Sequence, residues 1–170
     1  MNRLSYGFTL IELLVTITVA AILLAIGIPS LVDFYTRYRA DSNVKQIQQT
    51  LMFARNHAIS LGRKVSVCAL VESKCSYNWQ VGVSVFIDAN ENNQFDGDDS
   101  LLNVINAFSS QDTVSSNRIV FRFRADGLAS GTNGTIKYCP SDAKSPYSKS
   151  VIVNQAGRAR ISTANDVTCN

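Results

Sequence analysis

The chain has 170 residues, with 16 Lys and Arg against 13 Asp and Glu, so its formal net charge at pH 7 is only +3. This charge is too small to indicate a polyanionic partner by itself, and the length allows one domain beyond an N-terminal helix. The chain has a single His, no Gly-x-Ser-x-Gly sequence and no glycine-rich phosphate loop. We therefore predict that the protein is not an enzyme and binds no cofactor.

The first predicted element is the apolar segment 8–28, in which Glu12 is the only charged residue. Its 21 residues would form about 30 Å of helix, which matches the thickness of a membrane's hydrocarbon core. A carboxylate within such a segment costs at least ~2.5 kcal/mol in lipid. The polar leader, residues 1–7, ends in Gly7, so a small residue precedes the apolar stretch instead of following it as in a secretory signal. Cleavage after Gly7 would leave the apolar segment on the mature protein.

The sequence from Gly7 to Ser30, GFTLIELLVTITVAAILLAIGIPS, resembles the type IV pilin and type II secretion pseudopilin family. The resemblance implies that a prepilin peptidase cleaves after Gly7, that Phe8 is N-methylated, and that Glu12 pairs with the N-terminal amine of a neighbouring subunit. It also implies a single-pass inner-membrane protein with a periplasmic C-terminal domain, which assembles with other pilins into a pilus at the cell surface. The alternative is an ordinary membrane anchor with an incidental Glu.

The second predicted element is an amphipathic helix over residues 29–61, continuous with the apolar segment and bent at Pro29. Its apolar residues recur at steps of three and four, which predicts one buried stripe: Val44, Ile47, Leu51, Ala54, Ala58 and Leu61. Gly62 is predicted to end the helix. His57, on this helix, is interpreted as a surface or packing residue.

Residues 62–170 are predicted to form a β-rich globular domain, because the apolar period changes to two. The predicted strands are 64–70, 79–87, 101–108, 118–124, 135–139, 150–154 and 158–162. No βαβ alternation is present, so the sheet should be antiparallel, with Phe121 and Phe123 on one face. The predicted fold class is α+β and pilin-like: a long N-terminal helix, transmembrane in its first half, packed on an antiparallel β-sheet domain.

Four cysteines, Cys68, Cys75, Cys139 and Cys169, follow the membrane segment. In an oxidising periplasm they allow three disulfide pairings. We favour Cys68 with Cys75 and Cys139 with Cys169, because the second bond would hold the C-terminal tail. A zinc site is the rival, but no CxxC is present, so we predict no metal site.

The acidic loop 88–99 partly resembles an EF-hand loop, with oxygen ligands at its positions 1, 3, 5 and 9. Asn93 stands where glycine is usual, and Asp99 where a bidentate Glu is usual. A hydrated hairpin loop is the favoured interpretation, and calcium binding stays open.

The segments Trp79–Gly82, Phe86–Asn90, Phe121–Phe123 and Val151–Val153, with Gly157-Arg158-Ala159-Arg160, resemble the GspH/FimT branch of minor pilins and pseudopilins. In the FimT branch a GRxR motif is associated with DNA binding during natural transformation, and Gly157, Arg158 and Arg160 match it. From residue 113 onward the chain has eight basic and three acidic residues. Two arginines at i and i+2 of a strand lie on one side, about 6–7 Å apart.

We therefore predict a FimT-like minor pilin, active in competence, that grips DNA phosphates without reading sequence through Gly157, Arg158 and Arg160, with Lys144 and Lys149 extending the patch. Two alternatives remain: a GspH-like pseudopilin of a type II secretion system, and a structural pilus-assembly primer without a DNA ligand. In both, the arginines would be solvated charges of an edge strand.

Overall fold

The computed structural model describes residues 8–90, 92–129, 131–162, 164 and 166–169, and the chain divides into two units, residues 1–36 and 37–170. The first helix, α1 (Leu10–Leu61), begins in the first unit and ends in the second. It starts two residues later than Phe8, because Thr9 is its N-cap: the Thr9 hydroxyl accepts a hydrogen bond from the Glu12 backbone N–H at 3.3 Å. The predicted cleavage residue Gly7 lies outside the described residues.

In the first unit, α1 is an exposed apolar helix that continues through Pro29. Its threonine hydroxyls bond to carbonyls of the preceding turn, as Thr16 does to Leu13 at 2.8 Å and Thr18 to Leu14 at 3.0 Å. The hydroxyls therefore add no unsatisfied polar group to the apolar surface. Among the described residues, α1 is the one helix long and apolar enough to cross a membrane.

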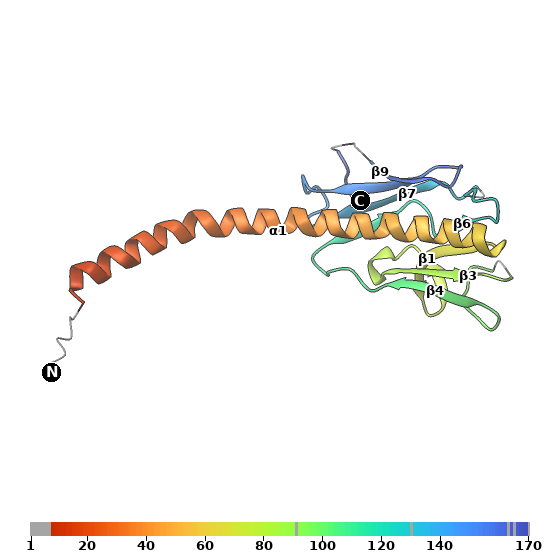
Figure 1. Ribbon diagram of the computed structural model, residues 1–170, viewed down its shortest axis with the longest axis horizontal. Helices are drawn as coiled ribbons and strands as arrows, with labels where there is room; N and C mark the ends of the chain where they lie inside the picture. The colour runs from red at the N-terminus through yellow and green to blue at the C-terminus, as the bar shows by residue number, and fades with distance from the viewer. Residues whose placement is uncertain (1–7, 91, 130, 163, 165, 170) are drawn as a thin grey trace. The chain divides into compact units, whose positions relative to one another are not determined.

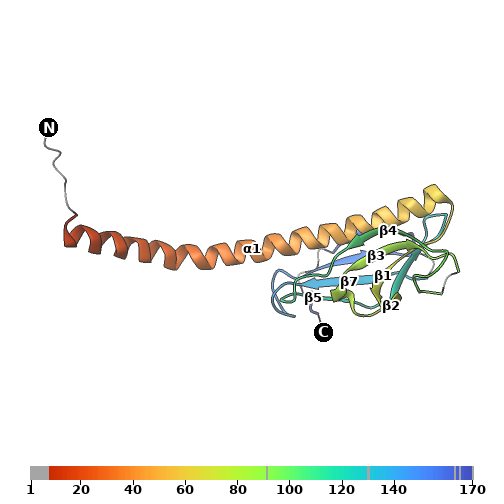
Figure 2. The same cartoon turned by 90° about the horizontal axis from the view of Figure 1, so that it is seen from below.

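In the second unit, α1 lies along both β-sheets and buries one stripe (Figures 1 and 2). The buried helix residues are Ala40, Val44, Ile47, Thr50, Leu51, Ala54 and Ala58. Leu61, predicted in the stripe, is 45% exposed, because the helix ends there. Gly62 has φ +61° and donates its N–H to Ile59, while Arg63 donates to Ala58, which is a Schellman motif; the helix therefore ends before Gly62, as predicted.

The globular part contains two antiparallel sheets where the sequence predicted one. The first sheet has the order β2-β1-β3-β4, with β6 also paired to β1, and the second has the order β5-β7-β8-β9. The first-sheet strands are β1 (Val65–Val71), β2 (Lys74–Ser76), β3 (Val83–Ile87), β4 (Ser100–Ile105) and β6 (Val120–Phe123). The second-sheet strands are β5 (Thr113–Ser116), β7 (Gly134–Cys139), β8 (Lys149–Val153) and β9 (Ala159–Ile161).

The strand prediction is wrong at residues 79–81, which form a 3-10 turn, η1 (Trp79–Val81). Trp79 is fully buried, donates its indole N–H to the Arg118 carbonyl at 3.0 Å, and packs edge-on against Phe121. The following Gly82 has φ +116° and passes so close to the Ile105 carbonyl that a Cβ would lie 2.2 Å from it. Strands β2 and β5 were not predicted, because they are short and polar. Phe121 and Phe123 are both fully buried, as predicted.

Two disulfides are present, in the favoured pairing. Cys68–Cys75 joins β1 to β2, and Cys139–Cys169 joins β7 to the C-terminal tail. The tail is held further by the Cys169 backbone N–H, which donates to the Ala143 carbonyl at 3.0 Å.

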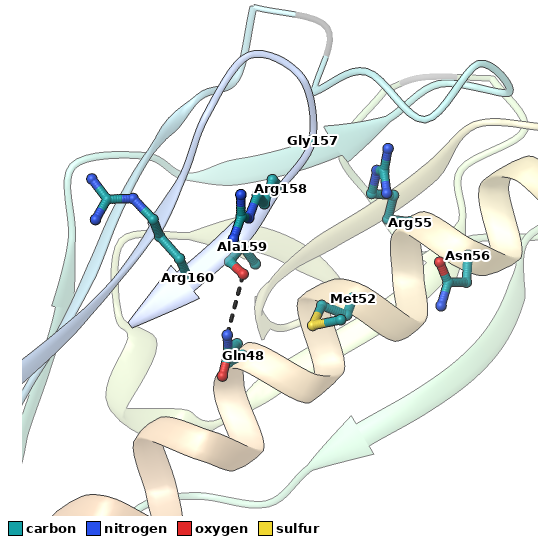
Figure 3. A pocket seen from close by; sticks show the side chains of 8 residues that line it. All are labelled: Gln48, Met52, Arg55, Asn56, Gly157, Arg158, Ala159 and Arg160. Atoms are coloured by element: carbon teal, nitrogen blue, oxygen red, sulfur yellow. Dashed lines mark hydrogen bonds between the residues drawn. The ribbon is translucent and has the colours of Figure 1, made fainter. Parts of the chain in front are cut away.

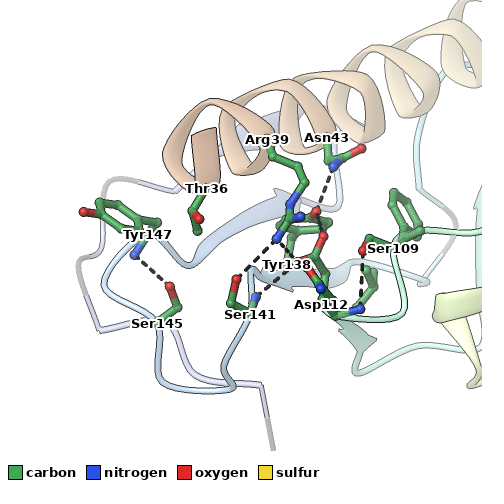
Figure 4. A network of polar contacts seen from close by, with 12 residues as sticks. Thr36, Arg39, Asn43, Ser109, Asp112, Tyr138, Ser141, Ser145 and Tyr147 are labelled. Carbon is green, nitrogen blue, oxygen red and sulfur yellow. Dashed lines mark hydrogen bonds and ion pairs between the residues drawn. The ribbon is translucent and has the colours of Figure 1, made fainter. Parts of the chain in front are cut away.

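A buried polar network fixes α1 to the second sheet (Figure 4). The Asp112 carboxylate, whose side chain is fully buried, accepts a hydrogen bond from the Arg39 guanidinium at 2.7 Å, from the Tyr138 hydroxyl and from the Ser141 backbone N–H. Asn43 of α1 donates to the same tyrosine oxygen at 2.7 Å. Burial, reinforced by Asp112, raises the pKa of Tyr138 well above its usual value. The helix position is therefore set by paired charges as well as by apolar packing.

Candidate nucleic-acid interface

The hairpin between β8 and β9 presents the predicted arginine motif. Asn154 organises its turn: the Asn154 N–H donates to the Arg158 carbonyl at 3.1 Å, and the Asn154 side-chain oxygen accepts from the Arg158 N–H at 2.9 Å. The Gly157 N–H closes the turn on the Asn154 carbonyl at 2.9 Å. Only Ala159–Ile161 are strand residues, so Arg158 directly precedes β9.

Gly157 permits a close contact between two turns. It has φ +75°, and a Cβ placed on it would lie 1.9 Å from the Gly127 carbonyl oxygen. Gly127 itself has φ +79° and lies against Ile59 of α1. The Arg55 guanidinium of α1 donates its Nε–H to the same Gly127 carbonyl at 3.0 Å. A side chain at position 157 would therefore separate the hairpin from the Gly127 turn and the helix.

Arg158 and Arg160 lie on one side of the hairpin edge, because both are exposed while Ala159 between them is buried. Among the described residues, no ion pair joins either arginine to a carboxylate. Both residues line a groove of about 210 Å³ between the hairpin and α1 (Figure 3). The groove is lined by Gln48, Met52, Arg55 and Asn56 of α1 and by residues 157–160.

Arg55 is the cation that the sequence did not reveal. It is one of four Lys and Arg residues on α1, and only the tertiary packing brings it to the hairpin. Its Nε–H donates to the Gly127 carbonyl, and the residue also lines the groove. Guanidinium groups bind phosphate oxygens with paired N–H donors, so Arg55, Arg158 and Arg160 form a site suited to a chain of phosphates.

The two predicted lysines do not line this groove. Lys149 forms an ion pair with Asp41 of α1. Lys149 and Ile152 are three positions apart on β8, and Ile152 is the partner of Arg160, so strand alternation puts Lys149 and Arg160 on opposite faces. Lys144 is exposed in the loop before β8, where its backbone N–H donates to Asp142 at 2.8 Å.

The other sequence candidates lie apart from the groove. His57 packs its ring against Phe53, with centroids 4.1 Å apart. In the acidic loop, Asp88 accepts backbone N–H bonds from Asn92 and Asn93, and Asp99 accepts them from Ala89 and Asp96. The described part of the chain contains no group of three His, Cys, Asp or Glu side chains placed to hold a metal ion. Phe8 and Glu12 are exposed in the first unit.

The long helix on antiparallel sheets defines a pilin-like protein, and comparison with known families agrees. The prokaryotic N-terminal methylation motif matches residues 2–28, and the family described as Type II transport protein GspH matches residues 43–157. The chain belongs to this GspH family of pilins and pseudopilins, which are structural proteins and not enzymes. It is anchored in the inner membrane, its C-terminal domain is periplasmic, and it assembles with other pilins.

Two crystal structures of the type IV minor pilin FimU from Pseudomonas aeruginosa resemble the chain. One has a TM-score of 0.64 at 20% identity and covers 81% of this chain and 99% of the FimU chain. The other has a TM-score of 0.59 at 21% identity and covers 76% of this chain and 99% of the FimU chain. At this identity the likeness shows the shared fold. Comparison with curated proteins gives no match.

Proposed function

We propose that the protein is a minor type IV pilin that binds DNA through its phosphate backbone during natural transformation. Arg158 and Arg160 grip successive phosphates, and Arg55 approaches the same strand from α1. The observation that supports this proposal is the groove in Figure 3, which is lined by three arginines from two segments distant in the sequence, Arg55 of α1 and Arg158 and Arg160 of the hairpin. The fold shared with the type IV minor pilin FimU is compatible with assembly into a pilus.

The chemistry of the groove favours phosphate contact without sequence reading. Among the residues that the structure describes, no aromatic side chain lines it, so none offers the bases a stacking surface there. The apolar floor at Met52 and the amide groups of Gln48 and Asn56 can contact sugars without selecting a base. The DNA affinity should therefore depend strongly on salt and weakly on sequence.

The test is a fluorescence-anisotropy titration of full-length protein in non-ionic detergent with labelled DNA of two unrelated sequences. Arg158→Gln and Arg160→Gln should each weaken binding by about 10-fold, the size expected for a lost charged hydrogen bond. Arg37→Gln is the matched control: Arg37 is exposed on the same helix, about 27 Å before Arg55 at ~1.5 Å per residue.

Binding that is absent in the wild type, or equal in all variants, would contradict the proposal. The arginines would then be solvated edge charges, and the pseudopilin or assembly-primer function would be favoured. A pulldown against the other pilins of the same filament would then identify the protein ligand.

A further inference from the structure

The second sheet has an outer face that continues from the arginine motif. Cross-strand partners share a face of a sheet, and Arg160 is paired with Ile152, which is paired with Thr135 of β7. In the next row, Ser150 is paired with Lys137, and Lys137 with Ser115 of β5. Arg160, Thr135 and Lys137 therefore lie on one face. The opposite face carries the buried side chains of Tyr138, Val151 and Ala159, which pack in the core with α1.

A polar hollow of about 380 Å³ lies at the far end of this outer face. It is lined by Ser115, Ser116, Asn117, Thr135 and Lys137. The Lys137 ammonium donates to the Thr168 carbonyl of the C-terminal tail at 2.9 Å. An ammonium has three N–H donors, so this contact fixes the side chain and leaves donors for a ligand.

The spacing across the face matches a nucleic-acid strand. Arg160 and Lys137 are two strands and two residues apart, or about 12 Å at ~4.8 Å between strands and ~3.3 Å along a strand. Successive phosphates of an extended strand are about 6–7 Å apart, so this distance corresponds to about two phosphate steps. The strands of the second sheet carry no Asp or Glu, so no carboxylate on them opposes an anion on this path.

We propose that a DNA strand held at Arg158 and Arg160 continues across the outer face of the second sheet and places a further nucleotide in the hollow at Lys137. This inference rests on the proposed DNA-binding function. Lys137 binds a phosphate of that nucleotide, and the hydroxyl and amide groups of the hollow donate hydrogen bonds to its sugar or base. The half-buried Ile152 lies under the strand between the two cationic positions.

The experiment compares two oligonucleotides, (dT)3 and (dT)12, bound to full-length protein in non-ionic detergent at several salt concentrations. For (dT)12, Lys137→Gln should lower the affinity several-fold and reduce the slope of log K against log salt by about 0.7, the value for one phosphate of a single strand. The arginine pair alone can hold (dT)3, so Lys137→Gln should change neither the affinity for (dT)3 nor the slope of its salt dependence. Lys74→Gln is the matched control, because Lys74 is an exposed lysine of β2 on the other sheet. This variant should bind both oligonucleotides as the wild type does.

A second variant tests the path by gain of binding. Thr135→Lys adds a cation between Arg160 and Lys137 and should raise the (dT)12 affinity and steepen the slope by about 0.7. Ser100→Lys adds the same charge at an exposed position of β4 and should not steepen it. Each variant should have the same thermal unfolding temperature as the wild type, which would show that the substitution leaves the fold intact.

The outcomes separate the two proposals. One outcome is that the arginine variants no longer bind (dT)12 while Lys137→Gln and Thr135→Lys bind it with the wild-type affinity and salt slope. DNA would then bind at the motif without crossing the sheet, and this inference would be wrong. If the wild type binds neither oligonucleotide, the proposed function fails, and the inference fails with it.

Discussion

At the scale of single residues, the arginine motif combines two tasks. Gly157 gives the backbone the space to lie against the Gly127 carbonyl, while Arg158 and Arg160 carry the charge. Arg55 connects the two tasks, because its guanidinium bonds to the Gly127 turn and also lines the groove. The glycine of the motif is therefore a structural requirement for the position of the arginines.

Gly157→Ala should destabilise the hairpin and weaken DNA binding although both arginines remain. The new Cβ would lie 1.9 Å from the Gly127 oxygen at φ +75°, so the turn must move. Gly131→Ala is the control, because Gly131 has a similar φ of +72° but open space around it. Chemical denaturation should show a cost of about 1–3 kcal/mol for the left-handed backbone strain of either variant. A larger cost and a loss of DNA affinity should occur only at Gly157. Equal losses in both variants would mean that the close contact has no role.

Tyr138→Phe should destabilise the protein at pH 7 by about 1–3 kcal/mol, because it removes the hydroxyl that joins Asn43 to Asp112. The same variant should alter the pH dependence. The folded-state pKa of Tyr138 is raised above the unfolded value of about 10, so the folded protein binds more protons than the unfolded chain above pH 10. The free energy of unfolding therefore falls as the pH rises from about 10, and below that pH the contribution is fully present.

Denaturation curves between pH 8 and pH 11 check this sign. The wild type should lose more stability across that range than Tyr138→Phe does. Tyr77→Phe, which changes a tyrosine that is 62% exposed, should follow the wild-type profile. A Tyr138→Phe profile parallel to that of the wild type would show that this hydroxyl is not linked to folding.

At the scale of helices and strands, long periodic segments were predictable and short polar ones were not. The stripe at Val44, Ile47 and Leu51 gave the packing face of α1, because burial on a helix repeats every 3.6 residues. Strands β2 and β5 carry too few apolar residues to show alternation, and they exist because neighbouring strands pair with them. The division into two sheets could not be predicted either, because sequence patterns do not indicate which strands are neighbours.

The two disulfides should contribute unequally to stability. Cys139–Cys169 spans 30 residues and Cys68–Cys75 spans 7. In the chain-entropy account, removing the long loop should cost about 3.5 kcal/mol and removing the short loop about 2.5 kcal/mol. Urea denaturation of the two double Cys→Ser variants measures this difference. A larger loss from the Cys68–Cys75 pair would show that native contacts around the acidic loop outweigh loop entropy.

At the scale of the whole molecule, the N-terminal sequence was the most informative part of the chain. The glycine before an apolar run with one Glu predicted the pilin class, and the methylation-motif match agrees. The groove beside the arginine motif was only half predictable. The arginine motif is visible as a local pattern, whereas Arg55 and Lys137 reach their places through tertiary packing and strand register. For the same reason Lys149, close to the motif in sequence, lies on the opposite face.

Replacing Gly7 by a bulky residue such as Leu should block processing, because the resemblance to prepilins implies that the peptidase cleaves after this small residue. The variant should remain a membrane-held precursor that still carries residues 1–7. Intact-mass spectrometry of the membrane fraction distinguishes the two forms, with the unmodified chain as the control. A normal mature mass for the variant would contradict the assignment of the leader.

The most direct test of the account is DNA capture by assembled pili on cells whose only copy of this protein carries Arg158→Gln and Arg160→Gln together. Fluorescent DNA bound per cell is measured alongside the number of pili, with Arg37→Gln as the control strain. The account predicts normal pilus numbers with strongly reduced DNA capture in the double variant, and unchanged capture in the control. Undiminished DNA capture on normally piliated double-variant cells would contradict it.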